Sequence, residues 1–297
     1  MIILTAGHSR VHVLPEVGGS LAGWWLGDAP LLRATDAADR ASGDPTWLAG
    51  FPLVPYSNRI GAGRFDWAGT PVTLPCREPD EPHALHGLGW RLPWRLTRKA
   101  ADRATLQLDH PGGPDWPWPF VARQEIVVEP DGLRLELSAR NLADQPAPLA
   151  IGHHPYFARE AAWLALAADS VWLTGPDRLP GTLVPPSGAL DLSAPTLAAA
   201  REIDHCYQAV AWPARLGWHG RDHALLLDAS SNLPCAVVYS NAANRALCIE
   251  PVAHSSNALN RADSAAPMPS VPPGASFSCT ITMRIVPAAS LGGATPR

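Results

Sequence analysis

The fold class is decided by one stretch, Ile126-Val127-Val128-Glu129-Pro130-Asp131-Gly132-Leu133-Arg134-Leu135-Glu136-Leu137-Ser138. An apolar run precedes its Pro-Asp-Gly segment, and leucine alternates with polar residues after it. Successive side chains of a strand point to opposite faces, so a period of two indicates a half-buried strand. The Asp-Gly pair suits the tight turn between two antiparallel strands. The stretch therefore predicts a β-hairpin.

The same period of two recurs near the C-terminal end. One face there is apolar and consists of Phe277, Cys279, Ile281, Met283 and Ile285. The other face carries Ser278, Thr280, Thr282 and Arg284. Shorter strands, each closed by turn residues, are predicted at 11–14, 104–108, 224–227, 235–239 and 246–249. Residues 161–166 fit a short helix or another strand equally well.

Proline and glycine are frequent, with 32 and 24 among 297 residues, so few stretches are long enough for a long helix. We therefore expect an all-β chain, one large antiparallel sandwich of roughly ten or more strands with few short helices. No repeat or interdomain linker is visible. Residues 1–297 are accordingly interpreted as a single domain, with a tail at 287–297 whose small and polar composition predicts fraying.

Composition excludes several classes of protein. The hydrophobic content of 46% and charged content of 17% predict a folded chain. A net charge of -4 without a basic run argues against a nucleic-acid partner. No apolar run reaches the roughly 18 residues of a membrane span, and the N-terminal residues lack the basic start of a signal peptide. Five scattered cysteines argue against a disulfide framework and favour a reducing cytoplasm.

Polar residues suited to binding sugar hydroxyls or moving protons gather in four segments, 57–65, 86–87, 152–157 and 248–251. Glu250 follows an apolar strand and precedes Pro251, which cannot extend a central ladder, so we expect the strand to end there. A carboxylate at such a rim sees a cleft but little bulk water, and this raises its pKa and suits a general base. The alternative is a glutamate that is simply solvated at a strand end.

Two adjacent histidines, His153 and His154, precede a proline that favours extended backbone. Their side chains should therefore point to opposite faces, so one of them at most faces a given cleft. Histidine changes charge near neutral pH and can lend a proton, whereas the alternative is a core histidine bound to backbone. His83 and His86 raise the possibility of a metal, but no carboxylate or cysteine stands at ligand spacing, so none is expected.

Taken together, these segments resemble the aldose 1-epimerase (galactose mutarotase) family in order and approximate spacing. The matching motifs are Asn58-Arg59-Ile60 with Gly63-Arg64-Phe65, Leu85-His86-Gly87 with Trp90 and Trp94 beyond, His154-Pro155-Tyr156-Phe157, Asp204-His205-Cys206-Tyr207, and Glu250-Pro251 with Ala258-Leu259-Asn260. Two features depart from the family pattern. Ala158 stands where asparagine is common, and the segment after His86 is shorter than in the galactose enzymes.

The resemblance implies a galactose mutarotase-like β-supersandwich that interconverts the α and β anomers of an aldose without a cofactor or metal. Glu250 would take the proton of the C1 hydroxyl while protonated His154 gives one to the ring oxygen. The remaining residues would serve the substrate. His86 would act at the ring oxygen or an adjacent hydroxyl, Asp204 and Arg59 would hold hydroxyls, Asn58 would steady the turn carrying Arg59, and Tyr156 would contact the ligand.

Two alternatives stay open at this point. A hexose-6-phosphate 1-epimerase of the same superfamily has similar His-Pro-Tyr and Glu-Pro motifs, and Arg64 or Arg91 could reach a phosphate. A noncatalytic carbohydrate-binding sandwich is also compatible with the fold. The partner expected in each case is a small sugar, bound by a monomer or homodimer, and a free sugar is preferred because the net charge offers no attraction for a dianion.

Overall fold

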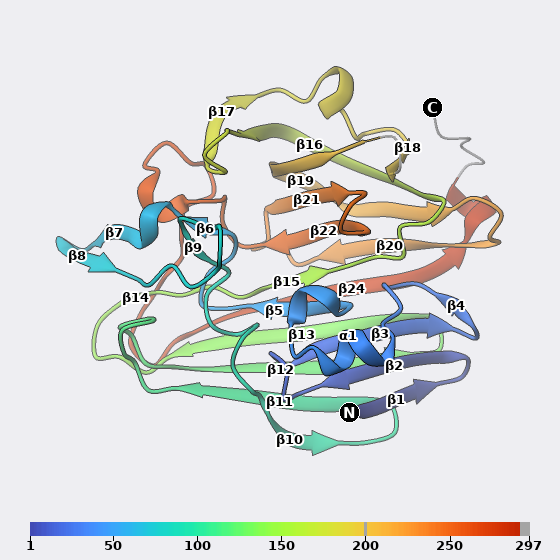
Figure 1. The fold of residues 1–297 in the computed structure, drawn as a ribbon, viewed down its shortest axis with the longest axis horizontal. Helices are drawn as coiled ribbons and strands as arrows, with labels where there is room; N and C mark the ends of the chain where they lie inside the picture. The colour runs from blue at the N-terminus through green and yellow to red at the C-terminus, as the bar shows by residue number, and fades with distance from the viewer. Residues whose placement is uncertain (199–200, 292–297) are drawn as a thin grey trace.

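Strands in two packed sheets make up most of the chain in the computed structural model, which describes residues 1–198 and 201–291 (Figure 1). The smaller sheet has the order β1-β2-β3-β5-β15, with β4 beside β3. Its strands are β1 (Ile2–Ala6), β2 (Ser9–Leu14), β3 (Ser20–Leu26), β4 (Ala29–Pro30), β5 (Gly50–Leu53) and β15 (Gly152–Pro155). The sequence prediction of an all-β sandwich is confirmed.

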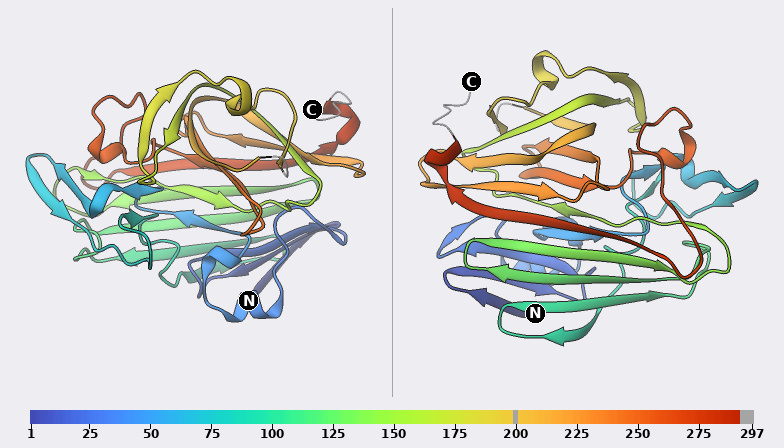
Figure 2. Two further views of the ribbon diagram at one scale, coloured as in Figure 1. Left: turned by 45° about the horizontal axis from the view of Figure 1, so that its top comes forward. Right: turned by 180° about the vertical axis from the view of Figure 1, so that it is seen from behind.

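The larger sheet has the order β10-β11-β12-β13-β24-β20-β19-β16-β17 and is antiparallel throughout. Figure 2 shows it from behind, with β24 between β13 and β20. Its strands are β10 (Arg95–Lys99), β11 (Arg103–His110), β12 (Phe120–Glu129), β13 (Gly132–Asn141), β16 (Ala162–Thr174), β17 (Pro180–Val184), β18 (Thr196–Leu197), β19 (Ile203–Trp218), β20 (His223–Ala229), β21 (Cys235–Asn241), β22 (Ala246–Val252) and β24 (Ser276–Pro287). Strand β18 pairs with β16, and β21 joins β22 to β19.

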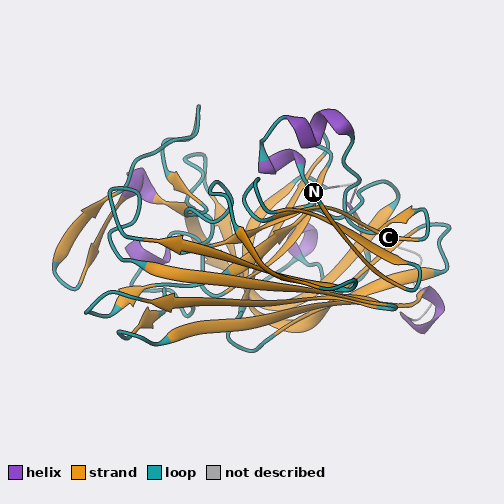
Figure 3. Cartoon of the chain, turned by 90° about the horizontal axis from the view of Figure 1, so that it is seen from below, coloured by secondary structure: helices purple, strands orange, loops and turns teal. Residues whose placement is uncertain are grey.

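Three small ribbons and a few short helices complete the described chain (Figure 3). The ribbons pair β6 (Arg59–Ile60) with β9 (Ala84–Leu85), β7 (Arg64–Trp67) with β8 (Thr70–Thr73), and β14 (Ala147–Pro148) with β23 (Ser270–Val271). The helices are α1 (Ala37–Ala41) and 3-10 turns at Pro45–Trp47, Gly61–Gly63, Gly188–Leu190, Ala258–Asn260 and Ala288–Leu291. Within the described ranges, none of these helices has the length and apolar character needed to cross a membrane.

The two sequence patterns that predict the fold pair with each other. The hairpin β12–β13 closes between Glu129 and Gly132, and β13 then lies antiparallel to β24. Leu135 lies opposite Ile281, and both are fully buried. Because both strands alternate with the same period, their apolar faces meet the core together and their polar faces meet solvent together.

The core lies between the sheets and is lined by large apolar side chains. Strands β1 and β2 pack over β11 and β12, whereas β15 lies against β22. The largest fully buried side chains include Trp24, Trp116, Tyr207, Phe51, Phe120 and Phe157. The contact between β15 and β22 brings the histidine pair of the sequence next to Glu250.

The structure decides one open choice of the sequence analysis and differs from two of its local expectations. Residues 161–166, left open between helix and strand, lie mostly in β16. In the tail predicted to fray, Pro287 ends β24 and Ala288–Leu291 form a 3-10 turn, whereas 292–297 lie outside the described residues. Strand β22 does not end at Glu250, because Pro251 stays in register with Ala236. In the described residues β22 forms a ladder with β21 and, on its other side, a single bridge between Cys248 and Tyr156, so the missing Pro251 N–H breaks no second ladder.

The hairpin core gives a stability prediction. Replacing the fully buried Leu135 with alanine should lower the free energy of unfolding by about 2–5 kcal/mol, because the side chain leaves a cavity between the sheets. Leu142, 48% exposed, is the matched control, and its alanine variant should change stability by less than about 0.5 kcal/mol. Urea denaturation of both variants measures the difference, and equal losses would contradict the assigned core.

Candidate active site

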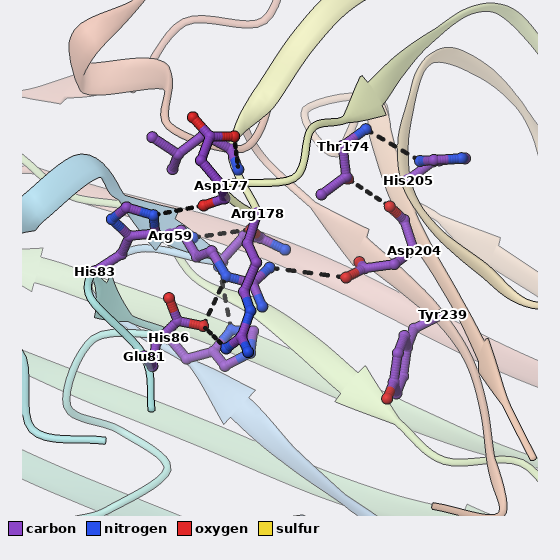
Figure 4. Close-up of polar contacts among 12 residues, drawn as sticks. Arg59, Glu81, His83, His86, Thr174, Asp177, Arg178, Asp204, His205 and Tyr239 are labelled. Atoms are coloured by element: carbon purple, nitrogen blue, oxygen red, sulfur yellow. Dashed lines mark hydrogen bonds and ion pairs between the residues drawn. The ribbon is translucent and has the colours of Figure 1, made fainter. Parts of the chain in front are cut away.

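A cavity of about 790 Å³ opens beside the contact of β15 with β22. All the site residues named from the sequence line it: Asn58, Arg59, His86, His154, Tyr156, Asp204 and Glu250. They come from both sheets and from the β6–β9 ribbon, segments far apart in the chain. Figure 4 shows part of this lining, with Arg59 directed toward Asp204. The fold therefore brings the whole predicted set to one place.

The floor of the cavity is a contact between an imidazole and a carboxylate. His154 Nε2 lies 3.2 Å from Glu250 Oε1, and the two side chains are only 6% and 2% exposed. His153, the next residue along β15, is fully buried on the other face, where neither ring nitrogen has a hydrogen-bond partner. The expectation that one histidine of the pair faces the cleft is confirmed. Glu250 is buried, so the alternative of a solvated strand-end glutamate is wrong.

Burial dominates the protonation of this pair. It raises the pKa of Glu250 well above its ordinary value, with the nearby Asp204 charge adding to the effect. It also lowers the pKa of His154 well below 6.5, with His86 adding to that effect. Both shifts favour the neutral form of each group, because the buried cavity floor disfavours separated charges.

His86 presents a hydrogen-bond donor beside the pair. Its Nδ1 accepts the backbone N–H of Asn58 at 3.1 Å, and burial lowers its pKa to about 3. The ring is therefore neutral, with its proton on Nε2. Asn58 has a φ of 56°, and its Oδ1 accepts the Arg59 N–H at 2.9 Å. Asn58 thus shapes the turn that carries Arg59, as the sequence suggested.

One wall of the cavity is a network of charged residues that the sequence indicated only in part (Figure 4). Arg59 Nε donates to Glu81 Oε2 at 3.0 Å, and its Nη1 lies 3.9 Å from Asp204 Oδ2. Arg178, from the loop between β16 and β17, donates to the same Glu81 oxygen at 3.2 Å. Sequence reasoning missed Glu81 and Arg178, since neither stands in a distinctive motif and only the packing of their loops joins them to Arg59.

Aromatic rings surround the pair. Tyr156 stacks on His154 with ring centres 4.6 Å apart and an angle of 18° between the planes. Phe51 lies 4.7 Å from His154 on the neighbouring strand, and Trp90 stacks on Phe51. The Tyr239 hydroxyl, on β21, accepts a hydrogen bond from Asn244 at 2.8 Å. These rings restrict water at the pair and offer apolar faces to a ligand.

The remaining histidine of the sequence pattern has a structural role. His83 Nδ1 accepts the Ala62 N–H at 2.9 Å, and its Nε2 lies 2.7 Å from the Asp177 carbonyl oxygen. The ring therefore joins two loops beside the cavity, and both of its nitrogens are engaged with backbone atoms. In the part of the chain that the structure describes, no group of three histidine, cysteine or acidic residues is arranged to hold a metal ion.

Comparison with known proteins shows which family and which folds this chain resembles. The sequence profile of the family described as aldose 1-epimerase matches residues 1–284. The uncharacterized protein YphB of Escherichia coli K12 is 25% identical over 295 residues, covering 96% of this chain and 99% of that protein. A galactose mutarotase-like protein of Clostridium acetobutylicum superposes with a TM-score of 0.86 at 19% identity, covering 96% of this chain and 94% of its own. Galactose 1-epimerase of Lactobacillus acidophilus superposes at 0.77 with 17% identity, covering 95% and 92%.

The buried histidine behind the site predicts a pH dependence of stability. Burial lowers the pKa of His153 to about 3, so between pH 6.5 and 3 the unfolded chain binds a proton that the folded chain does not. This residue should therefore reduce the free energy of unfolding by about 1.4 kcal/mol per pH unit as pH falls through that range.

Replacing His153 with leucine should flatten this slope, measured as urea midpoints from pH 7 to pH 4. His8 is exposed, and its leucine variant serves as the matched control with an unchanged slope. Identical slopes in wild type and His153→Leu would contradict the assignment of a neutral buried ring.

Proposed function

Because the chain belongs to the aldose 1-epimerase family, we propose that it interconverts the α and β anomers of a free aldose by opening and reclosing the sugar ring. The observation that carries the proposal is the 3.2 Å contact between His154 and Glu250 at the floor of the cavity. One group of this pair can accept a proton while the other donates one, and anomer interconversion needs both transfers.

Ring opening starts from the form in which the shared proton has moved to His154. The Glu250 carboxylate takes the proton of the C1 hydroxyl, and the His154 imidazolium gives its proton to the ring oxygen. The bond between C1 and the ring oxygen breaks, and the electrons of the O–H bond form the C1 carbonyl. The sugar supplies both the nucleophile and the leaving group, so these two residues suffice for the covalent change.

The pKa shifts of Glu250 and His154 favour this step. After ring opening, Glu250 is protonated and His154 is neutral, and burial favours this form of both groups. The same burial destabilises the form with a carboxylate and an imidazolium, so one proton moves from the C1 hydroxyl to Glu250 and the other moves from His154 to the ring oxygen. Rotation about C1–C2 then presents the other carbonyl face, and the reverse transfers close the ring as the second anomer.

The other lining residues suit hydroxyl recognition. His86 Nε2–H can donate to the ring oxygen or a neighbouring hydroxyl, and Asp204 can accept from one, since its side chain is 39% exposed. Arg59 donates from the same wall. Charge-assisted hydrogen bonds of this kind orient a sugar strongly. A noncatalytic sugar-binding protein would need such groups too, but it would not need a proton-sharing pair at the cavity floor.

The charges of the cavity favour a free sugar over its 6-phosphate. Its acidic lining residues are Glu78, Glu81, Glu202, Asp204 and Glu250, against the cations Arg59 and Arg178. Both arginines already pair with Glu81. Of the two arginines considered from the sequence, Arg64 does not line the cavity, and Arg91 pairs with Glu78 and stacks on Trp90. A phosphate dianion would meet no unpaired arginine here.

The Glu250→Gln variant should lose anomer interconversion while keeping the fold, because the amide preserves shape and removes the base. Polarimetry of freshly dissolved α-D-glucose and α-D-galactose should show a fall of roughly 10²-fold or more in rate. Glu129→Gln, at the distant β12–β13 turn, is the matched control and should keep the wild-type rate. Retention of more than about a tenth of the rate in Glu250→Gln would remove Glu250 from the mechanism.

Substrate choice should follow the charge of the cavity. We expect kcat/KM for glucose or galactose to exceed that for glucose 6-phosphate and to change little with salt. The Glu81→Gln variant frees the two arginines and should shift the ratio toward the phosphate. A wild-type preference for the 6-phosphate that falls steeply as salt rises would instead place the protein among hexose-6-phosphate epimerases.

A further inference from the structure

A buried arginine lies behind the acid/base pair without a carboxylate partner. Arg33 is 8% exposed, and its side-chain hydrogen bonds all go to carbonyl oxygens. Its Nε donates to Leu48 O at 3.0 Å, and its Nη2 donates to Leu48 O and Thr46 O. No carboxylate of residues 1–198 or 201–291 lies within 4.0 Å of this guanidinium. Burying an unpaired charge is costly, so its retention calls for a role.

Arg33 is joined to the pair through one aromatic ring. Its guanidinium carbon lies 3.9 Å from the ring centre of Tyr156, and that ring stacks on His154 at 4.6 Å. The backbone N–H of Arg33 also donates to Tyr156 O at 2.7 Å, which holds the arginine in place along the chain segment after β15. The positive charge is therefore held within about 8.5 Å of the His154 ring in a region of low dielectric.

We propose that Arg33 is a positioning residue of the acid/base pair, whose fixed charge opposes a positive charge on His154 and so drives the imidazolium proton toward the bound sugar. The effect of Arg33 on proton donation to a sugar rests on the proposed anomer interconversion. The effect of Arg33 on the charge of His154 does not. The Tyr156 ring lies between the guanidinium and the imidazole, so it separates the two groups and packs against both.

Arg33 is the permanent cation among the groups facing His154. Glu250 faces it from β22, and His86 faces it from the turn after β9. On its own segment lie His153 and Tyr156, and the pKa values of His86 and His153 are lowered to about 3, so both are neutral. Burial is the largest cause of the lowered pKa of His154, and the Arg33 charge acts in the same direction.

Arg33 itself keeps its charge. Burial lowers its pKa, but an ordinary arginine starts above 12, so the group stays protonated at neutral pH. Arg245 and Asp39 act on it with opposite signs, and Tyr156 and Cys248 are the other titratable groups around it. The proposal therefore concerns one fixed charge acting on one titrating ring.

The test follows the His154 ring directly by NMR of imidazole-labelled protein, with the signal assigned by its loss in His154→Asn. In wild type the ring should stay neutral from pH 8 to about pH 5. Arg33→Met keeps the aliphatic stem without the charge and should raise the pKa of His154 by about one, as expected for a charge at this distance. Arg33→Lys keeps the charge without the guanidinium fork and should leave the pKa of His154 low.

The matched control is Arg221→Met. Arg221 also stacks on an aromatic ring, 4.7 Å from the Trp218 centre, and donates to Pro30 O, but it lies outside the cavity lining. Its loss should leave the His154 titration and the polarimetric rate unchanged. In Arg33→Met we expect the acidic limb of the kcat pH profile to move toward neutrality, in step with the NMR titration of His154.

Three results would overturn the proposal: a wild-type His154 that titrates near pH 6.5, an unchanged titration in Arg33→Met, or equal shifts in Arg33→Met and Arg33→Lys, which would indicate a purely structural anchor. If Arg33→Met does not fold, Arg33→Gln, which removes the charge and keeps a donor for the carbonyl oxygens, takes its place in the titration. A wild-type protein without anomer interconversion would refute the proposed function while the NMR titration separately tests the Arg33 charge.

Discussion

The contact between β15 and β22 is the constraint on which the site depends. These strands belong to different sheets, and their packing places His154 against Glu250 where almost no water reaches. Burial raises the pKa of Glu250 and lowers that of His154, so it favours the neutral form of each. In the proposed reaction one proton moves to Glu250 and one leaves His154, so the core packing of the sandwich acts on both transfers.

The groups around this pair supply hydrogen-bond donors and exclude water, but they take no part in sharing its proton. Neutral His86 supplies a donor whose direction is fixed by the Asn58 backbone, while the aromatic rings keep water away. On the opposite wall Glu81 holds Arg59 and Arg178, so these cations are available for hydroxyls but poorly suited to a phosphate. The site is therefore polar around its rim and dry at its floor, which suits a ligand that is uncharged and rich in hydroxyls.

Most functional side chains stand on or beside strands. His154, Asp204 and Glu250 are strand residues, and Arg59 starts a short ribbon whose partner strand leads into His86. Strand positions fix side-chain directions more tightly than free loops do, which suits proton transfers that need well-defined distances. Arg33 lies behind these residues, and its guanidinium contacts the Tyr156 ring that stacks on His154.

Local pattern by itself determined the strands and the identity of the polar motifs. Alternation in 133–137 and 277–285 depends on the two-residue period of a strand, so the inward faces of Leu135 and Ile281 are visible before any fold is known, whereas their pairing is not. The motif residues could be named because their types suit proton transfer and hydroxyl binding. Sequence spacing also showed that only one of His153 and His154 can face a cleft.

Tertiary structure alone decided the charges and the partners. The raised pKa of Glu250 and the lowered pKa of His154 follow from burial between two sheets, which no local sequence records. Glu81, Arg178 and Arg33 escaped notice because their roles come from contacts between segments distant in the chain. Strand β22 continues past Pro251 because, among the residues described, its ladder with β21 lies on one side and its other side has only the bridge of Cys248 with Tyr156. A sequence specifies which groups are present, but their protonation depends on solvent exclusion and on neighbours that only the fold assembles.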